Sequence, residues 1–85
     1  MTWTVIFTVK AERDLAKLPD DIAKRIIRKI EAIAEDDPYN QLDRMTNSSY
    51  YKFRVGVYRG IVNIVNDKMI LQLVRARHSS QVYKK

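Results

Sequence analysis

The first residues of the chain alternate between two sides, which is the period of a β-strand. Over residues 2–9 (TWTVIFTV), one side is wholly apolar and the other side is mostly threonine. The apolar side consists of Trp3, Val5, Phe7 and Val9. This pattern predicts an N-terminal strand with one face more buried than the other.

Two helical stretches follow, separated by Pro19. In the first, Ala11, Leu15 and Leu18 recur at helical spacing behind Thr8, whose hydroxyl suits an N-cap. The second begins after Pro19, and Asp20 or Asp21 can cap it. Its apolar positions form one stripe, made of Ile22, Ala23, Ile26, Ile27, Ile30, Ile33 and Ala34. We therefore predict a short helix and then a long amphipathic one.

The long helix is expected to end near Ala34 or Glu35, because three acids and Pro38 follow. Residues 36–49 contain turn formers without a sustained period and are interpreted as a loop, from which Leu42 and Met45 reach back into the core. Three strand-like runs come next, at residues 50–55, 58–66 and 69–77. The gaps between them are short, so they predict antiparallel hairpins.

The resulting order is β-α-α-β-β-β, an α+β fold in which the two N-terminal helices pack on one face of a twisted antiparallel sheet. At 85 residues the chain is long enough for one domain, spanning residues 1–85, with a thin core. The opposite face of the sheet is then free to bind a partner.

Composition supports a globular protein, with 46% hydrophobic and 31% charged residues. The absence of cysteine excludes disulfides and thiolate sites and suits a reducing compartment. No run approaches 18 apolar residues, and the N-terminus lacks the features of a signal peptide. We expect a cytoplasmic protein that needs no cofactor or metal and has no membrane partner.

The net charge of +6 is unevenly distributed. Residues 1–49 carry eight Lys/Arg against nine Asp/Glu, whereas residues 50–85 carry eight Lys/Arg against Asp67 alone, a balance of +7. Solubility is one explanation for a basic surface. Segregation of the charge into the predicted sheet favours a polyanionic partner such as nucleic acid.

The basic residues of this half lie on alternate positions or near strand ends. Lys52 and Arg54 share one side of their strand, Arg59 begins the next, and Arg75 and Arg77 end the last. Strand register is not visible in the sequence. Parity alone therefore does not bring Lys52, Arg59 and Arg77 into one site.

Two motifs stand out in the second half of the chain, F-R-V-G-x-Y-R at residues 53–59 and R-H-x-x-x-V-Y at residues 77–83. With these motifs the chain resembles the RelE/ParE superfamily of toxins from prokaryotic toxin-antitoxin systems, and its RelE-like branch in particular. The resemblance covers nearly the whole chain. It implies the β-α-α-β-β-β fold, cleavage of mRNA in the ribosomal A site, and inhibition by a RelB-like antitoxin. Members of the ParE branch share the fold and inhibit DNA gyrase instead.

The resemblance also implies site residues. It places the catalytic cations at Lys52, Arg59 and Arg77 and the C-terminal aromatic residue at Tyr83. The candidates for binding the RNA backbone are Arg54, Arg75, Lys84 and Lys85. The chain departs from the superfamily pattern in having Ser79 and Ser80 after the histidine, and in lacking Leu-x-Gly before the second strand.

The chemistry of RNA cleavage through the 2′-OH suits these residue types. It needs a base, charge that stabilises a pentacovalent phosphorane, and an acid for the 5′-oxygen. Arg59 and Arg77 supply forked cations for phosphate oxygens. The base is either His78, whose ordinary pKa is near 6.5, or a Lys52 whose pKa neighbouring cations would have to lower. Tyr83 is expected to stack on a nucleobase of the RNA.

Each of these interpretations has a structural alternative. His78 can be an exposed residue at a strand end, Tyr83 an anchor on the sheet, and Arg54 and Arg75 members of surface ion pairs. The basic residues of the second helix form a solvated face or contact ribosomal RNA. For the whole protein, the alternatives to an endoribonuclease are a non-catalytic inhibitor of DNA gyrase and an inactive homologue.

Overall fold

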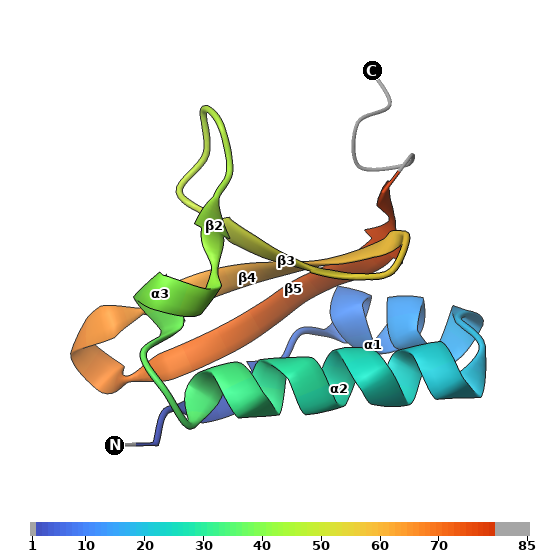
Figure 1. Cartoon of the computed structure of the whole chain (residues 1–85), viewed down its shortest axis with the longest axis horizontal. Coiled ribbons are helices and arrows are strands. Elements are labelled where there is room, and N and C mark those ends of the chain that lie inside the picture. The colour runs from blue at the N-terminus through green and yellow to red at the C-terminus, as the bar shows by residue number, and fades with distance from the viewer. Residues whose placement is uncertain (1, 80–85) are drawn as a thin grey trace.

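The computed structural model describes residues 2–79 of the chain. In that range a strand and two helices precede a short helix and four further strands (Figure 1). Their bounds are β1 Thr4–Phe7, α1 Val9–Lys17, α2 Asp20–Ala34, α3 Pro38–Gln41, β2 Asp43–Arg44, β3 Tyr51–Val55, β4 Tyr58–Val65 and β5 Ile70–His78, with a 3₁₀ turn at Asn66–Lys68 between β4 and β5. The predicted α+β architecture is confirmed.

The five strands form one sheet in the order β1-β5-β4-β3-β2. The hairpins β3–β4 and β4–β5 are antiparallel, as predicted from the short gaps. β1 lies parallel to β5, with Thr4 opposite Ile70 and Phe7 opposite Leu73. The sheet is therefore mixed, and the prediction of a purely antiparallel sheet is wrong at this edge. Hairpin spacing cannot reveal this pair, because the two strands come from opposite ends of the chain.

The segment predicted as a loop, residues 36–49, contains α3 and β2. Asp37 caps α3 by accepting a hydrogen bond from the Tyr39 amide at 3.0 Å, and Pro38 occupies the first turn, where its missing N–H is not needed. Leu42 is buried, as predicted, and Met45 is partly buried. A four-residue helix and a two-residue strand are too short to leave a period in the sequence.

Both α1 and α2 cover the same face of the sheet (Figure 1). The core lies between these helices and the sheet. It is built by one apolar stripe of α2 and by the inward-facing residues of β3, β4 and β5. Its fully buried members include Ile26, Ile30, Ile33, Val62, Leu71 and Leu73. Trp3, Val5 and Phe7 of the predicted N-terminal strand pack against this core. The other face of the sheet carries no α1 or α2, so it can meet a partner.

The ends of the helices follow local chemistry. Thr8 is the N-cap of α1, as predicted, and accepts a hydrogen bond from the Ala11 amide at 3.1 Å. Val9 is the first residue of α1 and is 64% exposed, so it does not extend the strand as predicted. The N-cap of α2 is Pro19, and Asp20 and Asp21 lie in the first turn, where carboxylates favour the helix dipole. Within residues 2–79, no helix is long and apolar enough to cross a membrane.

Candidate functional site

Three arginines lie side by side on the three central strands of the sheet, close to the β3–β4 turn and to the end of β5. Arg54 of β3 lies directly opposite Arg59 of β4, and Arg59 lies directly opposite Arg77 of β5. In antiparallel pairs, directly opposite side chains lie on the same face about 5 Å apart. We call Arg54, Arg59 and Arg77 the arginine row. Their neighbours along the strands face the core, so the row occupies the face that α1 and α2 leave uncovered.

The three members of the arginine row differ in exposure. Arg54 is exposed and Arg77 is half-buried, whereas Arg59 is only 3% exposed. Nε and Nη1 of Arg59 are both shielded from solvent. The centre of the row is thus a buried cation, and its two ends are accessible.

The next row on the opposite face supports the arginines from below. Phe53, Gly60 and Ala76 lie opposite one another there, and all three are buried. A Cβ at Gly60 would overlap the ring of Phe53, so only glycine leaves room for that ring. The close packing of Phe53 on Gly60 holds β3 and β4 together directly behind Arg54 and Arg59.

Lys52 belongs to the neighbouring row on the same face as the arginine row. It lies opposite Ile61 of β4 on one side and opposite Asp43 of β2 on the other. Lys52 is half-buried, and one step of two residues along β3 separates it from Arg54. The structure therefore brings four of the predicted residues, Lys52, Arg54, Arg59 and Arg77, to one face.

Arg75, also predicted to bind RNA, is instead held by α1. Its Nε donates to Oδ2 of Asp14 at 2.7 Å, and its Nη2 donates to Oδ1 at 3.2 Å. The Asp14 carboxylate also accepts a hydrogen bond from the Ala76 amide at 3.1 Å. The ion-pair alternative for Arg75 is therefore the one that the structure shows, and its charge is largely balanced.

Asp14 fills a gap at the edge of the sheet. β1 ends at Phe7, opposite Leu73, so beyond that point β5 has no strand on this side. The pairing of β4 with β5 is irregular next to this point, because Ile61 pairs with Arg75 while Val62 pairs with Leu73. Thr8 donates to the Val74 carbonyl at 2.9 Å, and Asp14 receives the Ala76 amide. These two side chains hydrogen-bond to the backbone of β5 where β1 no longer pairs with it, and they fix the path of β5 just before Arg77.

The surroundings of Asp14 lower its pKa. Partial burial alone would raise it, but the hydrogen bonds from Arg75 and Ala76 and the charges of Arg75 and Arg77 outweigh that effect. The same hydrogen bond to Asp14 raises the pKa of Arg75. Sequence reasoning missed Asp14 entirely, because its partners are 61 and 62 residues away along the chain.

His78 does not join the arginine row. It lies opposite Tyr58, and the two rings meet edge to face with their centres 5.4 Å apart. As the residue after Arg77 on the same strand, His78 points toward the face that carries the helices. A hollow of about 380 Å³ is lined by His78 and Tyr58, by Lys17, Leu18 and Pro19 at the junction of α1 and α2, and by Asp14, Arg75, Ala76 and Arg77. His78 and Arg77 therefore border the same hollow, although their side chains leave β5 on opposite faces.

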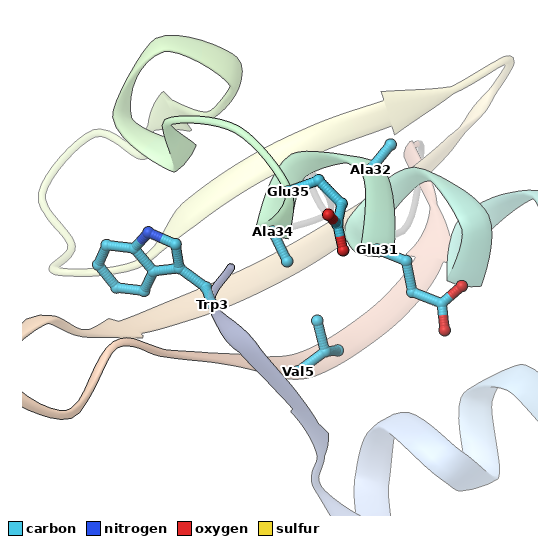
Figure 2. Close-up of a pocket in the computed structure, with 6 residues that line it drawn as sticks. All are labelled: Trp3, Val5, Glu31, Ala32, Ala34 and Glu35. Atoms are coloured by element: carbon cyan, nitrogen blue, oxygen red, sulfur yellow. The ribbon is translucent and has the colours of Figure 1, made fainter. Parts of the chain in front are cut away.

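A second hollow, of about 470 Å³, lies between β1 and the C-terminal half of α2 (Figure 2). Its walls are Trp3, Val5, Ala32 and Ala34, and its charged groups are the carboxylates of Glu31 and Glu35. This apolar and acidic hollow is unfavourable for anions. The arginine row lies on the other side of the sheet. Tyr83, Lys84 and Lys85, the remaining predicted site residues, lie outside the described residues.

Residues 5–83 match the sequence model of a protein family, which is described as the ParE toxin of the type II toxin-antitoxin system parDE. A search of curated protein sequences gives no significant match.

Solved structures show the same fold. A chain of the toxin-antitoxin complex RelBE2 from Mycobacterium tuberculosis is 26% identical, with a TM-score of 0.81, and the match covers 92% of this chain and 99% of that one. A mutant of the E. coli toxin RelE in the free state has a TM-score of 0.79 at 19% identity, covering 98% of this chain and 92% of that one. A chain of the RelB-RelE antitoxin-toxin complex from Methanococcus jannaschii has a TM-score of 0.72 at 24% identity, covering 93% and 95%.

Proposed function

The chain belongs to the family of ParE toxins of type II toxin-antitoxin systems, within the RelE/ParE superfamily, and from this premise we propose that it is a ribosome-dependent endoribonuclease that cuts mRNA in the A site and inhibits translation. The observation that carries the proposal is the arginine row. Guanidinium groups side by side on an uncovered sheet face can stabilise the negative charge of a phosphorane, and this supports the nuclease proposal.

The proposed reaction is attack of a ribose 2′-oxygen on the adjacent phosphorus, with departure of the 5′-oxygen. The 2′-OH gives its proton to the base, a P–O bond forms, and the phosphorane carries two negative charges. The bond to the 5′-oxygen then breaks, which leaves a 2′,3′-cyclic phosphate and a 5′-oxygen that takes up a proton from an acid or from water. Arg59 and Arg77 lie opposite each other. The half-buried Arg77 can place forked donors on the non-bridging oxygens, while Arg59, whose Nε and Nη1 are shielded from solvent, adds its positive charge beside them. Their charges are most valuable at the transition state, because the negative charge on the phosphate is greatest there.

For the base, the arrangement favours Lys52 over His78. Lys52 shares the face of the arginine row, one row away, whereas His78 packs on Tyr58 at the other face. A base must come within hydrogen-bond reach of the 2′-OH, so position decides before pKa does. Tyr83 keeps its proposed role of stacking on a nucleobase of the RNA. Arg54 is proposed to hold the backbone of the bound strand.

The ribosome supplies what the open face lacks. A sheet surface without a deep pocket cannot hold RNA in an in-line geometry, whereas the A site presents a constrained codon. Activity on free RNA is therefore expected to be poor.

The partner that neutralises the toxin is proposed to be a RelB-like antitoxin. Several similar structures are complexes of RelB with RelE, including those from Methanococcus jannaschii and Pyrococcus horikoshii. By the same reasoning the assembled complex is inactive, because the antitoxin covers or displaces a catalytic cation.

A second function has its own support. The family whose model matches is that of ParE toxins, and the resemblance to the ParE branch implies inhibition of DNA gyrase. One experiment separates the two. Brief induction of the protein in cells, followed by mapping of mRNA 5′ ends, is expected to show new ends within codons of translated messages. Unchanged mRNA ends together with loss of DNA supercoiling would replace the nuclease by the gyrase inhibitor.

A further inference from the structure

A basic groove lies between α2 and the end of β3. It has a volume of about 420 Å³, and it is lined by Arg25, Arg28 and Lys29 of α2 and by Arg54, Val55 and Gly56 of the β3–β4 hairpin. Figure 1 shows α2 passing beneath this hairpin. We call these residues the α2–β3 groove. Its four charged side chains are all cations, and all four are exposed.

The cations of the groove form no ion pair within 4.0 Å in the part of the chain that the structure describes. Arg25, Arg28 and Lys29 share one side of α2, since they are three and four residues apart. The acids of α2 are at its ends, at Asp20, Asp21 and Glu31. Across residues 2–79 the ion pair within 4.0 Å is that of Asp14 with Arg75, so the cations of the groove are not paired with a carboxylate there. Like charges held together favour the binding of an anion.

The groove continues the arginine row, because Arg54 belongs to both. β2 pairs with Tyr51 and Lys52 only, so the outer edge of β3 is uncovered from Phe53 onward. Cations therefore run from Arg77 across the sheet to Arg54 and then round this open edge to α2. The path leads from the uncovered face of the sheet to the side of the molecule that carries the helices.

We propose that the α2–β3 groove binds the sugar-phosphate backbone of single-stranded RNA, on the flank of the segment that lies over the arginine row. The proposal deepens the proposed function and rests on it for the placing of that segment. A single strand is required because the path bends round a sheet edge. A duplex is stiff over far longer distances than this domain. The groove offers cations and no aromatic side chain, so the binding is independent of sequence.

Contacts made outside the reacting phosphate act equally in the ground state and in the transition state. They lower KM and leave the chemical step unchanged. Their signature is the salt dependence of binding, since each phosphate neutralised on a single strand adds about 0.7 to the slope of log K against log salt.

The test is fluorescence anisotropy of a short labelled single-stranded RNA, titrated with the full chain freed of antitoxin at several potassium chloride concentrations. The variant is Arg25→Gln, Arg28→Gln and Lys29→Gln together. The matched control is Lys10→Gln, Arg13→Gln and Lys68→Gln, which removes the same charge from exposed positions that do not line the groove. Circular dichroism verifies that both variants are folded.

Loss of three phosphate contacts is expected to reduce the salt slope by about 2. Between 50 and 200 mM salt, the wild type then loses about twentyfold more affinity than the groove variant. The control is expected to keep nearly the wild-type slope. Equal slopes for all three proteins would overturn the proposal, as would an equal reduction in the control, because only net charge would then matter.

Two further outcomes decide between kinds of partner. If the groove variant loses affinity for duplex RNA as strongly as for single-stranded RNA, the single-strand proposal is overturned. If it binds RNA normally and loses an acidic antitoxin segment, the groove is a protein-docking surface and the proposal is likewise overturned. The assay measures binding alone. A wild type that shows the groove effect without cutting mRNA on ribosomes would refute the nuclease and leave the groove in place.

Discussion

Removal of the Asp14 carboxylate is expected to destabilise the end of β5 by a predictable amount. The side chain of Asp14 is 13% exposed, and it accepts hydrogen bonds from Arg75 and from the Ala76 amide. Hydrogen bonds that involve a charged group contribute about 1.5–3 kcal/mol. The side chain of Arg75 is 30% exposed and is hydrated again when its partner is lost, so a value in the lower half of this range applies. Asp14→Ala should therefore cost about 2 kcal/mol, or about 10 °C in Tm for a domain of this size.

Asp14→Asn separates charge from shape. Its amide oxygen can still accept from Ala76, while the charge that attracts Arg75 is gone, so we expect a loss of about 1 kcal/mol at neutral pH. The pKa of Asp14 is lowered in the folded protein, whereas in the unfolded chain it is about 4. The charge-dependent stability is therefore fully present above about pH 4 and is lost as pH falls through the folded pKa.

Thermal melts from pH 7 to pH 2 measure this difference. The gap in Tm between the wild type and Asp14→Asn should be constant from pH 7 to about pH 5 and should shrink below about pH 4. Asp67→Asn, at an exposed carboxylate of the turn before β5, should show no comparable gap. A gap that stays constant down to pH 2 would mean that the ion pair does not stabilise the fold, and the role assigned to Asp14 would be wrong.

Three further predictions concern packing, the β5 edge and ribosome binding. Gly60→Ala should lower the free energy of unfolding in urea by about 1–3 kcal/mol, because the added Cβ overlaps the ring of Phe53. In a Phe53→Leu background this loss should become smaller. The loss caused by Gly56→Ala should be the same in both backgrounds. Thr8→Val should cost about 1–2 kcal/mol and Thr8→Ser much less, since only the hydroxyl caps α1 and bonds the Val74 carbonyl; equal losses would contradict this. Binding of the protein to ribosomes, measured by sedimentation, should weaken steeply with salt, and a flat dependence would argue against RNA as its partner.

The sequence predicted those parts of the fold that depend on neighbouring residues. The stripe of α2, the cap at Thr8 and the two hairpins all arise from contacts within a few positions along the chain. The place of β1 beside β5 depends on a pairing of strands from opposite ends of the chain, and periodicity carries no information on that. The helix α3 is four residues long and is stabilised by an N-cap and by a proline in its first turn, so the sequence shows no repeating pattern there.

One of the two strand pairings that form the arginine row could be predicted from the sequence. A two-residue loop at Gly56 and Val57 sets Val55 opposite Tyr58, and this places Arg54 opposite Arg59 by counting alone. The pairing of Arg59 with Arg77 could not be counted, because the ladder of β4 and β5 is irregular between Ile61 and Val62. The separation of His78 from Arg77 followed from strand alternation and was available from the start.

Single-turnover cleavage of an mRNA programmed in the ribosomal A site tests the central claim most directly. Arg77→Ala removes a cation whose proposed role is greatest at the transition state. Its rate should fall by about a hundredfold or more, while its affinity for ribosomes stays within a few-fold. Lys68→Ala, an exposed cation in the turn before β5, should cut at the wild-type rate. An Arg77→Ala protein that cuts normally, or a wild type that stops growth without cutting mRNA while DNA gyrase activity falls, would contradict the account.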